Sequence, residues 1–69
     1  NQPIEPLFKA KVIVSALYKR KGPGKNYDIL GYLVKGEVVN VYEVKDGWYR
    51  IDSVEQIWSC GTNQYMQKV

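Results

Sequence analysis

Residues 37–52 read Glu37-Val38-Val39-Asn40-Val41-Tyr42-Glu43-Val44-Lys45-Asp46-Gly47-Trp48-Tyr49-Arg50-Ile51-Asp52. The first half of this stretch, residues 37–44, is rich in β-branched and aromatic residues, which favour β-strands. Residues 48–52 form a second run of the same kind. The dipeptide Asp46-Gly47 separates the two runs, and it is among the strongest hairpin signals because both residue types tolerate a positive φ. The stretch therefore predicts an antiparallel β-hairpin.

On either side of this hairpin the chain has further short extended segments. These are predicted at residues 9–14, 17–20, 29–33, 57–59 and 65–69. Glycine and proline turns separate them, most clearly Gly22-Pro23-Gly24 and Lys35-Gly36. No segment has the period of a helix of ordinary length. A short chain with this pattern is expected to close its sheet, which removes exposed edges. We therefore predict an all-β fold, a small closed barrel of short antiparallel strands.

The alternation of apolar residues indicates which side chains face the interior. On the hairpin, Tyr49 and Ile51 are expected inside, so Trp48 and Arg50 face the opposite side. The full predicted core is Val12, Val14, Leu17, Ile29, Leu33, Val39, Val41, Tyr49, Ile51 and Trp58.

The composition argues against catalysis. The 69 residues suffice for one domain, with no histidine and one cysteine, Cys60. A Ser-His-Asp or Cys-His arrangement cannot be built without histidine, and one cysteine forms no internal disulfide. We therefore expect a non-enzymatic binding domain without metal or cofactor, in which Cys60 is a small buried residue. No apolar run is long enough to span a membrane, and we expect no signal peptide among the first residues, because they lack a basic segment followed by an apolar one.

The first residues differ from the rest. Residues 1–7 contain Pro3 and Pro6 and show no periodicity, which indicates a stiff linker. We expect this linker to follow a catalytic domain in a longer protein, and residues 8–69 to form the β domain.

Several short motifs follow one another in a fixed order over residues 8–69: Ala16-Leu17-Tyr18-Lys19-Arg20-Lys21-Gly22-Pro23-Gly24, then Tyr27-Asp28-Ile29-Leu30-Gly31-Tyr32-Leu33, then Lys35-Gly36, then Asp46-Gly47-Trp48-Tyr49-Arg50-Ile51, then Trp58 and Tyr65. This order closely resembles the pattern of bacterial SH3 domains, which implies a small SH3-like barrel of five to seven short antiparallel strands. Two departures stand out. Tyr18 and Lys19 occupy positions that are usually small polar and apolar, which predicts Tyr18 inward and Lys19 outward. Ile57 precedes Trp58 where glycine is common.

The resemblance implies a function. Bacterial SH3 domains commonly target peptidoglycan hydrolases, such as phage endolysins and autolysins, to the bacterial cell wall. The expected partner is therefore peptidoglycan, through its peptide stem or cross-bridge, at the extracellular face of the wall. Such domains often occur as one of a tandem pair, so the resemblance leaves open a second SH3-like copy in the parent chain. By fold analogy, the ligand-binding residues are Trp48, Tyr65, Tyr27, Tyr18, Asp28 and Arg50.

Other interpretations remain open for single features. Trp48 and Tyr65 are either ligand platforms or packing residues, while Trp58 is read as core. The basic cluster Lys19-Arg20-Lys21 with Lys25 is a solvated surface, or else it attracts wall phosphates or nucleic acid. The alternative function is a protein-interaction SH3 module for proline-rich or other extended peptides. The basic loop argues against it, because such modules carry acidic residues there. Nucleic-acid binding is disfavoured because acidic residues dilute the positive charge.

Overall fold

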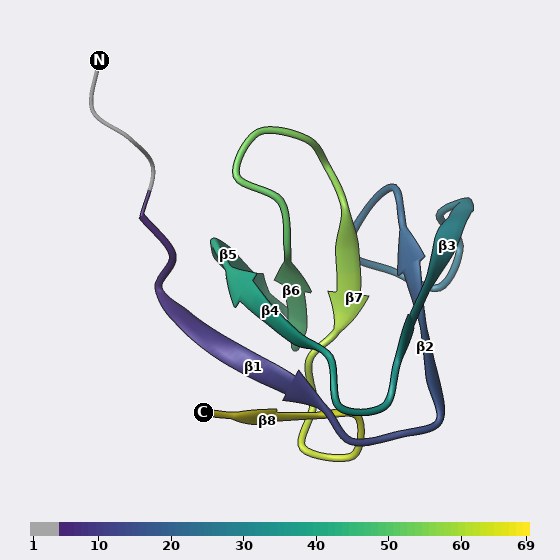
Figure 1. Ribbon diagram of the computed structural model, residues 1–69. Coiled ribbons are helices and arrows are strands. Elements are labelled where there is room, and N and C mark those ends of the chain that lie inside the picture. Colours follow the sequence, from purple (N-terminus) through teal and green to yellow (C-terminus); the bar gives the residue numbers. More distant parts are fainter. Residues whose placement is uncertain (1–4) are drawn as a thin grey trace.

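The computed structural model describes residues 5–69, and in these residues the chain forms strands and no helix (Figure 1). The predicted all-β class is confirmed. The strands are β1 (Phe8–Val12), β2 (Ala16–Arg20), β3 (Ile29–Val34), β4 (Val38–Val41), β5 (Glu43–Lys45), β6 (Trp48–Arg50), β7 (Trp58–Cys60) and β8 (Met66–Lys68).

The eight strands form two antiparallel sheets that close into a small barrel. One sheet has three strands in the order β4-β1-β8, and the other has five in the order β3-β2-β7-β6-β5. Figure 1 shows the three-stranded sheet below and to one side of the longer sheet, with β2 and β3 extending away from it. The architecture is that of an SH3-like barrel, with strands as short as the sequence predicted.

One predicted strand, residues 37–44, is divided between the two sheets. β4 pairs with β1, whereas β5 pairs with β6. The chain bends at Tyr42, whose N–H donates to the Arg50 carbonyl at 2.8 Å. The hydrogen bond keeps the backbone satisfied while it passes from one sheet to the other. This division makes eight strands where five to seven were predicted.

The predicted turn at Asp46-Gly47 is present. Both residues have positive φ, 51° at Asp46 and 81° at Gly47. Two successive positive φ values define the tight hairpin turn whose twist matches that of the flanking strands. The turn sets the register of β5 and β6, in which Lys45 lies opposite Trp48 and Glu43 lies opposite Arg50.

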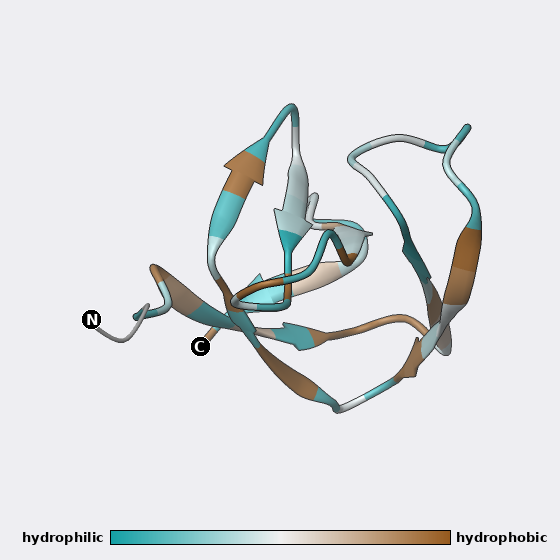
Figure 2. Ribbon diagram, turned by 90° about the horizontal axis from the view of Figure 1, so that it is seen from above, coloured by the Kyte–Doolittle hydropathy of each residue, from teal (hydrophilic) through white to brown (hydrophobic). Residues whose placement is uncertain are grey.

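The core lies between the two sheets. Its buried cluster consists of Ala10, Val12, Leu17, Leu33, Val41 and Met66. Each large apolar side chain in it contributes about 1.5–3 kcal/mol relative to an exposed one. The predicted residues Val14, Val39, Tyr49 and Ile51 pack against this cluster and are partly buried. Figure 2 shows that the strands carry both apolar and polar residues, as expected when one face of a strand meets the core.

The core prediction for Ile29 was wrong, because its side chain is 51 % exposed. Simple alternation from Leu33 through Gly31 would place Ile29 inside. However, the pairing of β2 with β3 shifts between Lys19 and Arg20, so that Ile29 lies opposite Arg20. A bulge of this kind reverses the faces of all residues beyond it.

The prediction that Tyr18 faces inward and Lys19 outward was also wrong. Tyr18 is 54 % exposed, and Lys19 is half-buried. The stem of Lys19 crosses Gly31 on the neighbouring strand, with Cε 3.3 Å from where a Cβ of Gly31 would lie. A long aliphatic stem can occupy a position that is usually apolar while its ammonium reaches water, so no rearrangement is needed.

The predicted linker of residues 1–7 lies largely outside the described residues, which begin at Glu5. Nowhere in residues 5–69 is there a helix with the length and apolar character needed to cross a membrane.

Candidate functional site

A hollow of about 100 Å³ opens on the surface where β2, β6 and β7 meet the turn before β8. Three aromatic side chains line it: Tyr18 from β2, Trp48 from β6 and Tyr65 from the turn. All three were predicted as ligand-binding residues, although they are widely separated in the sequence. The tertiary fold therefore brings half of the predicted site together.

Strand pairing explains how these aromatic side chains meet. Trp48 at the start of β6 lies directly opposite Cys60 at the end of β7. Next to it, Arg20 of β2 lies opposite Trp58 of β7. Directly opposed residues of antiparallel strands share one face of the sheet, as do residues two apart on a strand. Tyr18 is two residues before Arg20, so the pairing carries it toward Cys60 and Trp48.

The hairpin alternation predicted for Trp48 is confirmed. Tyr49 packs against the core, where its ring meets that of Phe8 edge-to-face at 5.2 Å between centroids. Trp48 therefore points to the opposite side and contributes to the hollow. Its half-buried indole offers an apolar surface fixed by a short turn. Such a platform binds ligands with little loss of side-chain entropy.

Two positively charged residues complete the rim. Arg20 and Lys25 line the hollow, and no carboxylate is among its lining residues. The Arg20 guanidinium carbon lies 5.6 Å from the centroid of the Tyr18 ring, within the range of a cation–π contact. Arg20 Nη1 donates to the carbonyls of Lys25 at 2.9 Å and Tyr27 at 3.0 Å. These bonds tie the loop after β2 to the strand that carries Tyr18.

Leu17 and Cys60 provide the remaining lining. Cys60 is half-buried, and its Sγ lies 3.8 Å from Thr62 Oγ1. Neither residue was predicted at the site. Arg20 and Lys25 were named only as members of the basic cluster. The basic cluster was visible in the sequence, but the sequence does not indicate which of its four cations line the hollow. The path of the loop decides that.

The other three predicted site residues lie elsewhere. The ring of Tyr27 packs against Gly22, where a Cβ would overlap it. Asp28 accepts the Lys21 N–H with its backbone carbonyl at 3.0 Å, and its side chain is exposed. Neither lines the hollow. Tyr27 and Asp28 therefore belong to the loop that supports Arg20 and Lys25.

Arg50 is held by groups of its own hairpin. Its Nε lies 3.1 Å from Glu43 Oε1, and its Nη1 donates to the Asp52 carbonyl at 2.6 Å. Its side chain is only 14 % exposed. Two bonds and this degree of burial give Arg50 a structural role in the hairpin.

Trp58 is buried, with 2 % of its surface exposed, which confirms its reading as an interior residue. Its Nε1 donates to Gln56 Oε1 at 3.0 Å. The Gln56 side chain therefore satisfies the indole N–H in the segment where Ile57 replaces the more common glycine. Trp58 contributes no surface to the hollow.

Comparison with known families gives a match to the bacterial SH3 domain over residues 15–58. This range is more than half of the chain. It includes Tyr18, Arg20, Lys25 and Trp48, whereas Cys60 and Tyr65 lie beyond it. Neither the curated proteins nor the solved structures give a match.

Proposed function

This chain belongs to the bacterial SH3 domain family, and from that premise we propose that it binds peptidoglycan and holds a lytic enzyme at the bacterial cell wall. The family consists of binding modules, which commonly take cell-wall components. The parent protein in this proposal is a hydrolase such as a phage endolysin or an autolysin. It acts at the extracellular face of the wall, with residues 1–7 as the linker to its catalytic domain.

The observation that carries the proposal is the convergence of Tyr18, Trp48 and Tyr65 on one hollow. Aromatic rings of this kind pack against the apolar faces of sugars and against peptide backbones and side chains. A mostly apolar hollow with a few polar groups at its rim is typical of a ligand site. Attachment to a polymer raises the local concentration of the linked enzyme, and a tandem copy would multiply that effect.

The charge of the rim argues against the alternative of a proline-rich ligand. Modules that bind such peptides place acidic residues near the groove to meet a basic residue of the ligand. Here the charged lining residues are Arg20 and Lys25, both positive. A basic ligand segment would be repelled rather than held.

The proposal is tested with a fluorescent fusion of residues 1–69 incubated with purified Gram-positive walls. We expect retention that falls at least tenfold in Trp48→Ala and in Tyr65→Ala. The matched control is Val54→Ala, which removes a 77 % exposed apolar side chain from a loop outside the hollow.

Each variant is first checked for a folded state by circular dichroism. Absence of retention on every wall tested, with the wild-type domain folded, would refute the proposal. Retention that survives both aromatic substitutions would leave wall binding in place but exclude the hollow as its site.

A further inference from the structure

We propose that the hollow recognises a carboxylate group of a peptide, held by Arg20 and Lys25 while the adjoining carbon atoms pack on Trp48 and Tyr65. The inference rests on the proposed function, because it specifies which part of a wall peptide is bound. It concerns a single anionic group, not a general attraction to negative charge.

The first observation is the sign of the charges around the hollow. Its charged lining residues are Arg20 and Lys25, and its other lining residues are neutral. Among the described residues the ion pair formed by an arginine is that of Arg50 with Glu43, at the opposite end of β6 from Trp48. The positive charge at the rim is therefore not neutralised by a carboxylate of the hollow itself. A ligand carboxylate would supply the missing partner.

The second observation is the way Arg20 is held. A guanidinium has five N–H donors, of which two are on Nη1. The bonds to the Lys25 and Tyr27 carbonyls both come from Nη1. In the described part of the chain, Nε and Nη2 donate to no protein acceptor. This leaves a side-on fork whose geometry matches the two oxygens of a carboxylate.

Backbone anchoring is important for this fork. The two carbonyls fix the position of the guanidinium but leave its positive charge uncompensated. Because the Arg20 side chain is already held in place, binding a ligand carboxylate costs little of its conformational entropy.

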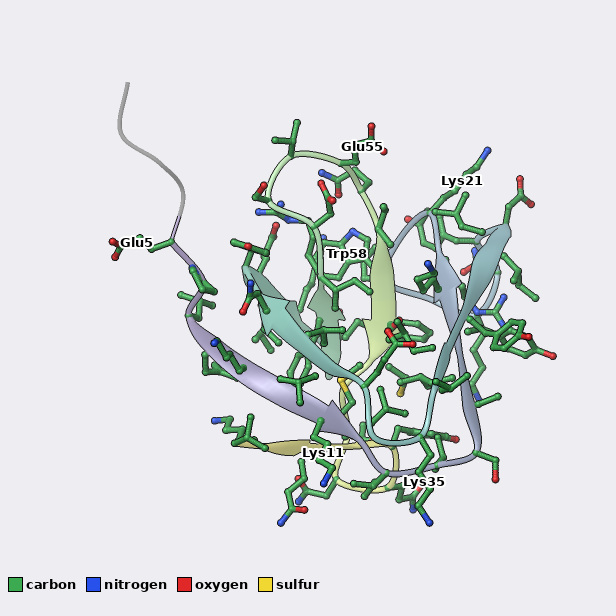
Figure 3. All side chains as sticks on the ribbon, in the orientation of Figure 1. Glu5, Lys11, Lys21, Lys35, Glu55 and Trp58 are labelled. Carbon is green, nitrogen blue, oxygen red and sulfur yellow. The ribbon has the colours of Figure 1, made fainter. Side chains whose placement is uncertain are left out.

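The third observation separates Arg20 and Lys25 from the rest of the basic cluster. Lys19 lies across Gly31, away from the lining. Lys21 extends into solvent from the end of β2, as Figure 3 shows. The four cations therefore do not form a continuous track for a polyphosphate chain or a nucleic acid, which needs several phosphate contacts in a row. Two cations at one hollow suit one anionic group.

The size of the hollow agrees with such a group. Its volume of about 100 Å³ is well below the roughly 300–1,000 Å³ of pockets that enclose a whole small molecule. It admits the end or a side branch of a peptide, and the rest of the ligand would extend over the exposed ring of Tyr18. A carboxylate attached to a small aliphatic carbon fits the apolar wall and the cationic rim together.

The test uses one synthetic stem peptide, L-Ala-γ-D-Glu-L-Lys-D-Ala-D-Ala, in two forms. One form has both carboxyl groups free, and the other has both converted to amides. The ¹⁵N-labelled domain is titrated with each form and followed by NMR at the Trp48 indole and the Arg20 Nε–H. We expect the acid to bind at least about tenfold more tightly than the amide, since a bidentate charge-assisted pair is lost.

Three variants locate the effect. Arg20→Lys keeps the charge but loses the fork, and Lys25→Gln removes the second cation while its backbone carbonyl still anchors Arg20. Both are expected to reduce the preference for the acid. Lys21→Gln is the matched control from the same loop and should retain it. If Arg20→Lys does not fold, the peptide pair and Lys25→Gln still decide the question.

Equal affinity for the acid and the amide, or no detectable binding of either, would overturn the inference. So would glycerol phosphate that binds as tightly as the peptide, because the hollow would then be a phosphate site. If the domain is retained on walls but shows no preference for the acid, the proposed function stands and only the carboxylate site is refuted. Preference for the acid without wall retention would refute the proposed function and keep the carboxylate site.

Discussion

The aromatic ring of Tyr49 lies directly against the α-carbon of Gly61, so closely that a methyl group there would overlap ring atoms. The Gly61 N–H also donates to the Gly47 carbonyl at 2.8 Å. Gly61 thus joins the end of β7 to the hairpin turn that immediately precedes Trp48.

Gly61→Ala is therefore expected to lower the free energy of unfolding by about 1–3 kcal/mol, the usual effect of overpacking. In a domain of this size that is a large fraction of the total stability. Urea denaturation measures it. Gly31→Ala is the control, because its new methyl group would meet only the flexible end of Lys19. An equal loss in both variants would contradict the close packing of Tyr49.

The bulge in β3 predicts opposite results for two similar residues. Ile29→Ala removes a side chain that is 51 % exposed, whereas Leu33→Ala removes one that is 4 % exposed. We expect a loss below about 1 kcal/mol for Ile29→Ala, because little apolar surface is uncovered. Leu33→Ala should lose about 2 kcal/mol or more through the cavity it creates. Thermal or urea unfolding distinguishes them, and comparable losses would place Ile29 back in the core.

Asp52 makes the stability of the loop after β6 sensitive to acid. The N–H groups of Glu55 and Val54 donate to Asp52 Oδ2 at 2.7 and 2.9 Å, and these bonds lower the pKa of the carboxyl group. Partial desolvation opposes them, and the charge of Arg50 adds to them. The bonds favour the ionised form, so the folded state has the lower pKa.

Their contribution is therefore fully present above the unfolded-state pKa of about 3.9 and is lost as the pH falls through the lower folded-state value. We expect the urea midpoint of the wild type to fall below about pH 4 more steeply than that of Asp52→Asn, which does not titrate. Superimposable acid profiles of the two proteins would show that the carboxylate has no such role.

The two tryptophans are expected to differ in fluorescence quenching. Trp48 is half-buried at the hollow, while Trp58 is 2 % exposed. Acrylamide should therefore quench one part of the emission readily and the other poorly. Trp48→Phe should remove the readily quenched part and leave Trp58 protected. If Trp48→Phe instead leaves the quenching unchanged, the indole of Trp48 is not accessible from the hollow.

Much of the fold follows from local sequence. The Asp46-Gly47 turn, the alternation of Trp48 and Tyr49, and the glycine and proline turns each act over a few residues, so that short-range rules predict them. The class of fold follows as well, since short strands without a helical period leave a closed sheet as the economical arrangement. The family resemblance was also visible, because it depends on short motifs and their order along the chain.

The remaining features depend on contacts between distant residues. The bulge that exposes Ile29 comes from the pairing of β2 with β3, and the bend at Tyr42 comes from two sheets competing for one strand. The composition of the hollow also lies beyond sequence periodicity. By itself the sequence determined a small β-barrel of the bacterial SH3 family with aromatic candidates for binding. Only the tertiary structure decided that Tyr18, Trp48 and Tyr65 meet beside Arg20 and Lys25, because strand register and loop path, not sequence spacing, bring those side chains together.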